Sequence, residues 1–334
     1  MGAKVLRYLQ LGKETTSGTA VAATTRLRWE PGAVIQDMRE ITEVEEAIGQ
    51  RFGKGRTYQA KLLAQLDVGD QPATFEELPY WLQAGVEGLA SASQDGTEGS
   101  TYIYQYDAGN TAAITPTTYT IEASTGQEAY EMEYGFVSEF SLAGAAGEAL
   151  TVSGTWFGRQ VSDTTMTAAQ TVQDVDEILF GNGKLYIDAA GGTIGTTQKE
   201  DTWLGFNLTV PTGLVPNFTA DGNVYFTSAK WAPEDAPTLE LTTRYDATGA
   251  ALMDAAKAGS VKLVRMTFEG PDAGTAGDSY SCKTLNIDMA VVPTEVPSAE
   301  DDGGDDTLTF NFSVVDSDST QLQFIVVNEL SALA

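Results

Sequence analysis

The residue types that most often carry out chemistry in proteins are scarce in this chain, apart from carboxylates. Its 334 residues include 47 Asp and Glu and one Cys, but no His. Without imidazole, the chain cannot form a Ser-His-Asp or Cys-His nucleophile pair, a His-held metal site or a histidine pH switch. A single thiol cannot close an internal disulfide or build a Cys-rich zinc or iron–sulfur site. Carboxylate chemistry is the class left to consider.

The carboxylates do not form a pattern that identifies a catalytic or metal site. Neighbouring acids such as Glu76-Glu77 are expected by chance in a chain with 47 carboxylates, so they do not indicate acid–base catalysis. The run Glu300–Asp306 could offer oxygen ligands to calcium, but it lacks the calcium-loop spacing that ends in a bidentate Glu, and a solvated turn is the preferred interpretation. Cys282 has neither a partner nor a base nearby in the sequence. We therefore expect no enzymatic activity, no metal and no cofactor.

Net charge excludes another class of function. With 19 Lys and Arg, the formal net charge is −28 at pH 7. Affinity for nucleic acid comes mainly from basic side chains that release counterions, so this protein should repel DNA rather than bind it. The charge is also unevenly distributed, because residues 62–158 contain 14 acids and residues 284–334 contain 10, and neither segment contains Lys or Arg.

Composition indicates a folded protein, with 42% hydrophobic and 9% aromatic residues. The longest apolar stretches have strand length, so we expect no membrane insertion. The first eleven residues lack the apolar core and cleavage site of a signal peptide, and we expect that the protein is not secreted.

Alternation of apolar and polar residues is the dominant pattern, and it predicts a mainly β fold. The clearest runs are Tyr130–Phe136 and Leu308–Val314, and further strands are expected at residues 4–11, 58–68, 102–106, 184–188, 203–210, 238–245, 261–268 and 280–292. Only two helices are expected. One runs from Phe75 to Ala84 after the possible cap Thr74, and the other runs from Ala250 to Ala258 before Gly259.

The order of these elements suggests an internal repeat. A shift of 174 residues places Leu78 on Leu252 and Gly85 on Gly259, and a shift of 172 places Phe140 on Phe312. We therefore predict two β-sandwich or barrel-like domains, residues 1–165 and 166–334, each with one short helix, and a linker near Ser162–Thr167. Because any two alternating hairpins can be slid into register, unrelated halves remain the alternative.

Residues 40–56 form a polar, glycine-rich segment of mixed charge between two expected strands. We predict a protruding hairpin or loop there. Such a segment could contact an acidic neighbour, or it could be a mobile loop with solvated charges. Besides Glu40, its charged residues are Glu43, Glu45, Glu46, Arg51, Lys54 and Arg56.

The opening segment Leu11–Thr25 resembles the start of tail tube proteins, the major tail proteins of bacteriophages with long, non-contractile tails. The resemblance lies in Glu14-Thr15-Thr16-Ser17-Gly18-Thr19-Ala20, which matches a Glu-Thr-x-x-Gly-Thr-Ala pattern near the N-termini of that family. The order of strands, long inter-strand loop, one helix and more strands also fits the family. The second helix-plus-strands unit departs from its simplest members, which have a single tube domain.

The resemblance implies a structural virion protein that assembles in the host cytoplasm. Tube domains place their inner sheets edge to edge in rings, which stack into the tail tube around a lumen for DNA. Members with two tube domains form trimeric rings of pseudo-sixfold symmetry, and six subunits per ring is the alternative. The expected partners are further copies of the chain and the tape-measure, tail-tip and tail-terminator proteins.

Two sets of residues are candidates for roles in such a tube. Glu131, Glu133 and Glu139 alternate with an apolar face, so we expect them on the lumen wall, where carboxylates would keep DNA from adsorbing. The charged residues of the segment 40–56 are candidates for contact between rings.

Three other interpretations remain open at this stage. The chain could be another two-domain β-sandwich protein, such as a capsid decoration protein or an adhesin. It could be a hydrolase that uses carboxylates alone, which would require a pocket with two acids at fixed separation. Its acidity could also reflect a salt-adapted host, in which case acids should cover every face.

Overall fold

The protein is mainly β, as predicted. The computed structural model describes residues 4–29, 32–86, 92–108, 115–232, 235–317 and 322–333. The elements of the first half are η1 (Lys4–Leu6), β1 (Tyr8–Lys13), β2 (Thr25–Arg26), β3 (Ile35–Asp37), β4 (Glu40–Glu45), β5 (Lys54–Lys61), β6 (Ala64–Pro72), α1 (Leu78–Gly85), β7 (Ser93–Gln94), β8 (Tyr102–Ala108), β9 (Tyr119–Ser124), β10 (Ala129–Ala145), β11 (Thr151–Gly158) and β12 (Ser162–Asp163).

The second half has a similar series of elements. They are η2 (Phe180–Asn182), β13 (Gly183–Ala189), β14 (Gln198–Lys199), β15 (Trp203–Pro211), β16 (Leu214–Asn217), β17 (Ser228–Trp231), β18 (Thr238–Arg244), α2 (Ala247–Ala258), β19 (Lys262–Asp272), β20 (Cys282–Pro293), β21 (Glu300–Asp302), β22 (Asp305–Val315) and β23 (Leu322–Asn328).

Strand pairing follows the same order in the two halves. The first half pairs β3–β6–β11–β10–β9–β1, and the second pairs β15–β18–β22–β20–β19–β13, all antiparallel. The strands β10 and β20 have matching positions in this order. Each also pairs with a strand that comes later in its half of the chain, β10 with β12 and β20 with β23. A hairpin, β4–β5 or β16–β17, precedes β6 or β18 in each half.

Spacing along the chain supports this correspondence in part. The strands β4, β5 and β6 begin at residues 40, 54 and 64, and β16, β17 and β18 begin at 214, 228 and 238, a constant spacing of 174 residues. The shift of 172 residues aligns β10 with β22. In the pairing order, however, β22 has the position of β11, so this shift does not align equivalent strands.

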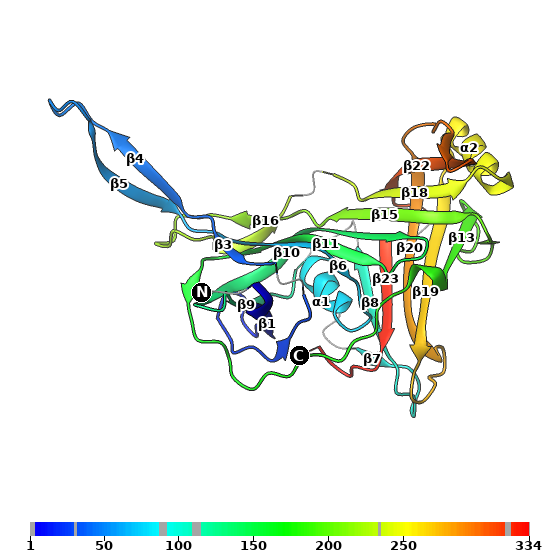
Figure 1. Cartoon of the computed structure of the whole chain (residues 1–334), viewed down its shortest axis with the longest axis horizontal. Helices are drawn as coiled ribbons and strands as arrows, with labels where there is room; N and C mark the ends of the chain where they lie inside the picture. Colours follow the sequence, from blue (N-terminus) through cyan, green and yellow to red (C-terminus); the bar gives the residue numbers. More distant parts are fainter. Residues whose placement is uncertain are drawn as a thin grey trace.

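One sheet crosses from the first half into the second. Residues Glu139–Ala145 of β10 pair with Gly205–Pro211 of β15, so the strands β3–β6–β11–β10–β15–β18–β22 form a continuous series. In Figure 1, β10, β15 and β18 run side by side, and β19, β20 and β23 run roughly at right angles to them. This arrangement is an orthogonal packing of sheets.

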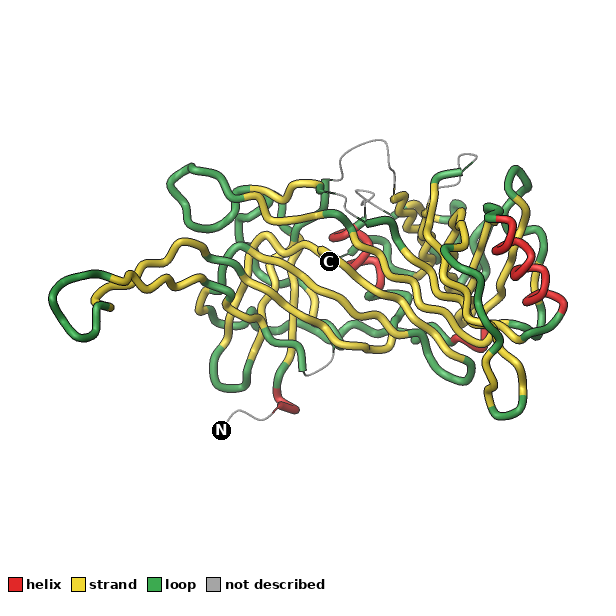
Figure 2. Tube along the Cα trace, turned by 90° about the horizontal axis from the view of Figure 1, so that it is seen from above, coloured by secondary structure: helices red, strands yellow, loops and turns green. Residues whose placement is uncertain are grey.

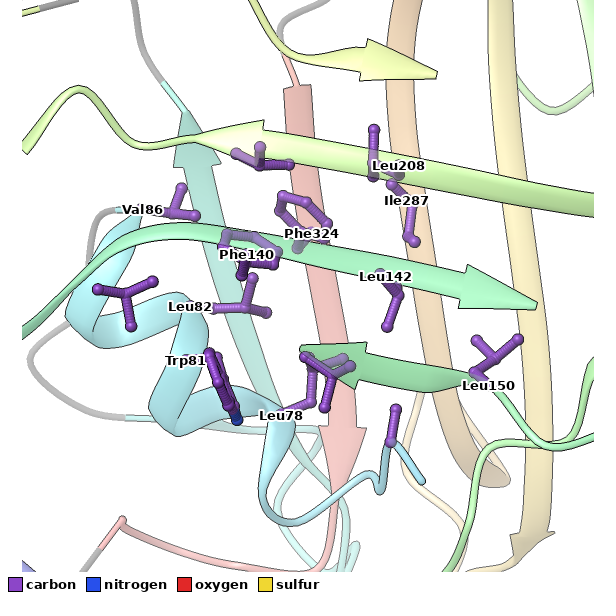
Figure 3. Close-up of a cluster of buried hydrophobic side chains, with 14 of the residues drawn as sticks. Leu78, Trp81, Leu82, Val86, Phe140, Leu142, Leu150, Leu208, Ile287 and Phe324 are labelled. Atoms are coloured by element: carbon purple, nitrogen blue, oxygen red, sulfur yellow. The ribbon is translucent and has the colours of Figure 1, made fainter. Parts of the chain in front are cut away.

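The helix α1 is the centre of the core of the first half. All eight of its residues are buried. Leu82 lies beside Phe140 of β10 (Figure 3), and the Trp81 ring packs against Trp29 and Trp156. Thr74 Oγ1 accepts a hydrogen bond from the Glu77 backbone N–H, as expected of a cap, but the regular helix begins at Leu78, later than predicted. Pro79 then lies in the first turn, where proline costs no helix hydrogen bond.

The helix α2 starts earlier than predicted and lies at the surface. Its cap is Asp246, whose carboxylate accepts hydrogen bonds from the backbone N–H groups of Thr248 and Gly249. It ends as predicted at Gly259, which has the left-handed conformation (φ 60°) that favours glycine.

The two halves are packed together through one hydrophobic core. Strand β8 of the first half pairs with β23 of the second, and buried Lys283 donates hydrogen bonds to Glu76 (2.6 Å) and Asp176 (2.7 Å). The expected linker is also held, because Glu122 accepts hydrogen bonds from the Thr167 backbone N–H and hydroxyl. The division at residue 165 therefore stays a prediction.

Candidate functional site

The most distinctive surface is the exposed face of the sheet that crosses both halves. Alternate residues of its strands point into the core, for example Leu66, Phe140 and Leu241, and the others point to solvent. The solvent side carries three exposed acids, Asp67 on β6, Glu139 on β10 and Glu240 on β18. We call this surface the acidic face. Other side chains on the acidic face include Gln36, Gln65, Ser141, Ser153, Thr155, Asn207, Thr209, Thr238, Thr242, Thr309, Asn311 and Ser313.

Short polar contacts hold the acidic face in place. Thr155 Oγ1 donates a hydrogen bond to Asp67 Oδ1 (2.9 Å), and the hydroxyls of Ser141 and Thr209 lie 3.0 Å apart across β10 and β15. Such cross-strand pairs fix the side chains on a sheet surface.

Basic residues are nearly excluded from the acidic face. The strands β3, β6, β10, β11, β15 and β22 contain no Lys or Arg, and β18 contains only Arg244 at its end. Among the described residues of these strands, Arg244 is therefore the one cation beside these carboxylates, and the face has a negative potential that would repel a polyanion in solution.

The structure does not bring together the three glutamates expected on one wall. Glu139 lies on the acidic face, but Glu131 is half-buried in the part of β10 that pairs with β9 and β12. Glu133 is buried, and its carboxylate accepts a hydrogen bond from Gln160 Nε2 (3.1 Å). Burial raises the pKa of Glu133, and this group is closed off from the surface of the sheet.

The cause is a change of sheet along β10. The strand pairs first with β9 and then with β11, and its register shifts between Met132 and Gly135 and again between Val137 and Glu139. At the first shift Tyr134 has a positive φ of 60°. At each irregularity the side of the strand that faces solvent can change. The alternation of buried and exposed side chains around Glu131 therefore does not predict the side on which Glu139 lies.

Two acids of the acidic face, Asp67 and Glu240, were missed by the sequence reasoning. A signal for both was present, because Asp67 lies between Leu66 and Val68, and Glu240 lies between Leu239 and Leu241. That alternation places each acid on the side of its strand opposite the core.

The predicted protruding hairpin is confirmed as β4–β5, which projects far from the body (Figures 1 and 2). Glu43 and Glu45 lie on β4, Lys54 begins β5, and the tip lies between them. Arg56 Nε donates a hydrogen bond to Glu46 (2.7 Å), so part of its mixed charge is paired within the hairpin. Apolar side chains are also exposed, with Phe52 at the tip 80% and Ile41 57% accessible. The rest of the chain does not cover these apolar groups.

A second, smaller apolar cluster lies where the two hairpins begin. It contains Leu63, Tyr134, Phe136, Leu214 and Phe226. Arg159 connects this cluster to the N-terminal loop, because it donates hydrogen bonds to the carbonyls of Gly18 (3.1 Å), Phe226 (3.0 Å) and Thr227 (2.7 Å) and its guanidinium lies over the Tyr134 ring. Arg159 therefore connects the segment that precedes β17 with the N-terminal loop and with β10.

Among the described residues, no group of three or more His, Cys, Asp and Glu is placed to hold a metal ion. No helix in the described ranges is long and apolar enough to cross a membrane.

A mainly β protein with a wide acidic sheet face and a projecting hairpin has the features of a structural subunit that contacts other proteins. The family model described as phage tail tube protein matches residues 6–315, and the chain belongs to this family. This confirms the resemblance found at Glu14–Ala20, and the chain is a structural component of a phage tail. No curated protein matches the sequence.

Proposed function

We propose that this chain assembles into stacked rings that form the tube of a long, non-contractile phage tail, and that the acidic face lines the lumen. The observation that carries this proposal is the sheet that crosses both halves and exposes Asp67, Glu139 and Glu240, with Arg244 at the end of β18 as the one basic residue in the strands that carry this face. DNA that passes such a wall is repelled by the carboxylates over about 8–10 Å, roughly the Debye length, and it does not adsorb. The tube is then an electronegative conduit for ejection.

The shared pairing order of the two halves supports three chains per ring. If each half acts as one tube domain, three chains supply six domains and give pseudo-sixfold symmetry. A ring also pairs sheet edges that would otherwise be exposed, and exposed edges invite aggregation. Hexameric rings remain the other arrangement.

The β4–β5 hairpin is proposed as the contact between stacked rings. Its length, its exposed Phe52 and Ile41, and its charged residues Glu43, Glu45, Glu46, Arg51, Lys54 and Arg56 fit a segment that is buried on assembly. The ends of the tube would meet tail-tip and tail-terminator proteins, and the lumen would hold the tape-measure protein before ejection. Assembly would take place in the host cytoplasm.

Electron microscopy of the purified protein tests this function. Hollow tubes built from repeating rings are expected, and threefold averaging should resolve two similar but distinct units per chain. Monomers that form neither rings nor tubes at high concentration, in the presence of tail-tip and tape-measure proteins, would refute the proposal.

A further inference from the structure

Lys283 on β20 is the one buried Lys or Arg side chain among the described residues, with 8% of its surface exposed. Its Nζ donates hydrogen bonds to Glu76 Oε1 (2.6 Å) and Asp176 Oδ2 (2.7 Å), and Glu329 Oε2 lies 3.9 Å away. The three carboxylates come from separate parts of the chain, ahead of α1, between β12 and η2, and after β23. None of these residues belongs to the acidic face or to the β4–β5 hairpin.

Glu76 contacts both of the groups that it separates in sequence. It is 2% exposed, and while its Oε1 accepts the hydrogen bond from Lys283, its Oε2 accepts one from the Asp176 backbone N–H (2.8 Å). A Cβ placed on Gly270 would come within 2.5 Å of the Phe75 ring and 3.3 Å of Lys283 Cβ, so an aromatic ring and the lysine stem enclose this side of the cluster. The amine and the two carboxyl groups are therefore fixed relative to one another.

A lysine amine that is held against a carboxyl group can form an amide with it. The attack requires a neutral amine, a neutral carboxyl group and close contact between nitrogen and carbon. The hydrogen bond between Lys283 Nζ and Asp176 Oδ2 brings the nitrogen close to the separation of about 3–3.5 Å from which such attacks begin. A further group must carry protons, because an ammonium and a carboxylate do not react with each other.

The protonation of the cluster makes Glu76 the group suited to carry protons. Burial acts to lower the pKa of Lys283, but the hydrogen bonds to Asp176 and Glu76 and the charges of these acids outweigh burial and raise the pKa, so the pair is ionic at rest. Burial raises the pKa of Glu76, and the hydrogen bonds from Lys283 and from the Asp176 backbone N–H oppose this shift. A carboxyl group that takes up a proton readily and contacts the amine is suited to general acid–base catalysis.

Among the three carboxyl groups, Asp176 is the one placed to lose an oxygen as water. Its side chain is 42% exposed and lines a pocket of about 210 Å³, so a water released there reaches solvent. Glu76 is buried, and both of its oxygens accept hydrogen bonds. Glu329 lies beyond hydrogen-bond distance of Nζ, and its Oε1 accepts a hydrogen bond from the Gly274 backbone N–H (3.0 Å).

We propose that Lys283 and Asp176 condense into an intramolecular isopeptide bond, and that Glu76 is the catalytic residue that carries the protons. One proton first passes from the Lys283 ammonium through Glu76 to the Asp176 carboxylate, which leaves a neutral amine beside a neutral carboxyl group. A bond then forms between Nζ and Asp176 Cγ, a second proton passes from the nitrogen through Glu76 to a hydroxyl on that carbon, and the C–O bond breaks. The products are an amide and one water, Glu76 returns to its starting state, and no oxidant or other reactant is consumed.

The bond would join the two halves where they meet. Asp176 and Lys283 are 107 residues apart, and the segment around Asp176 is already bonded to the first half. The Asp176 carbonyl accepts a hydrogen bond from the Phe75 backbone N–H (3.1 Å), and the Ile178 backbone N–H donates to the Ala73 carbonyl (2.9 Å). A covalent link from this segment to β20 resists separation of the halves at any salt concentration, and it does not depend on the proposed function.

Mass spectrometry of the purified full-length chain tests the bond. The unfolded protein should be lighter than its sequence requires by the mass of one water. Trypsin digestion of the unfolded chain should give a branched peptide in which the Lys283 side chain is joined to Asp176, with no cleavage after Lys283. A mass equal to that of the sequence would overturn the inference and leave an ion pair, and this measurement needs no variant.

Substitutions separate the roles of the residues. Lys283→Arg keeps the positive charge but removes the nucleophile, so it should have the full mass of its sequence. Glu76→Gln should also have its full mass, although Lys283 and Asp176 are still present, and circular dichroism shows whether it is folded. Asp176→Asn should lose ammonia instead of water, which an ion pair with a purely structural role does not produce. Glu329→Gln is the matched control and should still lose one water.

Each contrary outcome removes a named part of the inference. Loss of water that persists in Lys283→Arg would overturn the bond, because it would arise from another reaction, such as cyclisation at Asp302-Gly303. A branch at Glu76 or Glu329 would overturn the assignment of Asp176, and loss of water from folded Glu76→Gln would overturn the catalytic role of Glu76. None of these measurements requires rings, so their outcome is independent of the tube function.

Discussion

The carboxylate of Glu14 accepts a hydrogen bond from the backbone N–H of Tyr134, 120 residues further along the chain, at 2.8 Å. The same buried side chain accepts hydrogen bonds from the Gly18 backbone N–H (2.6 Å) and from the hydroxyls of Thr118 (2.7 Å) and Thr120 (3.0 Å). Glu14 is the acid of the motif that resembles tail tube proteins. Its role in this chain is to fold the N-terminal loop onto the bulge where β10 passes from one sheet to the other.

Removal of this carboxylate should therefore destabilise the whole fold. Glu14→Ala leaves four donors without their acceptor, and we expect the free energy of unfolding to fall by about 3 kcal/mol or more. Urea unfolding followed by tryptophan fluorescence measures the change. Glu148→Ala, at an exposed turn, should change stability by less than about 0.5 kcal/mol. Equal stability of the two variants would show that Glu14 does not hold the bulge.

Local pattern was enough to predict the fold class, the projecting hairpin and the ends of α2 to within a few residues. Alternation and capping residues act over a few positions, so they can be read without knowledge of the rest of the chain. The grouping of Glu131 and Glu133 with Glu139 was different, because it depended on the regularity of β10 over nine residues. The bulge at Tyr134 is stabilised by Glu14, which is distant in sequence, so no local sequence pattern predicts the bulge.

Burial of Glu77 should make stability depend on pH. Burial disfavours the charged form of Glu77 and raises its pKa from 4.5 to about 7. The hydrogen bond from the Arg28 backbone N–H and the positive charge of Arg28 act in the opposite direction, but their effect is smaller. The folded state then holds a proton that the unfolded state releases, so this group stabilises the protein below about pH 4.5. That contribution is lost as pH rises through about 7.

Glu77→Gln keeps the acceptor for Arg28 but removes the titration. We expect the variant to match the wild type near pH 4.5 and to exceed it at pH 8 by up to about 3 kcal/mol. Urea unfolding at both pH values measures this difference, and the neighbouring Glu76 is common to both proteins. A stability difference that is the same at both pH values would contradict the assignment. Glu148→Gln serves as the matched control on an exposed carboxyl.

The tip of the β4–β5 hairpin should be needed for stacking but not for folding. Deletion of residues 49–55 removes exposed Phe52 and Arg51 from a segment outside both hydrophobic clusters, so the free energy of unfolding should change little. We expect soluble rings that do not elongate, as seen by electron microscopy and sedimentation. Phe52→Ser should shorten tubes in the same direction, whereas Val224→Ser, at another exposed apolar position, should not. Tubes of normal length from the deletion variant would show that the hairpin does not form the contact between rings.

The acidic face should control the passage of DNA rather than the assembly of the tube. Glu139→Lys/Glu240→Lys places two cations on the exposed side of the sheet, where neither position contributes to the core, so tubes should still form. Phages with this tail protein should eject DNA more slowly, by roughly tenfold at low salt, and high salt should reduce the effect because these charges are screened. Glu131→Lys, on the part of β10 that pairs with β9 and β12, tests whether Glu131 lies on the lumen wall. Asp254→Lys on α2 is a control outside this sheet. Time-resolved release of DNA into a solution with an intercalating dye measures the rate. Normal ejection from tubes that carry both lysines would show that the acidic face does not line the lumen.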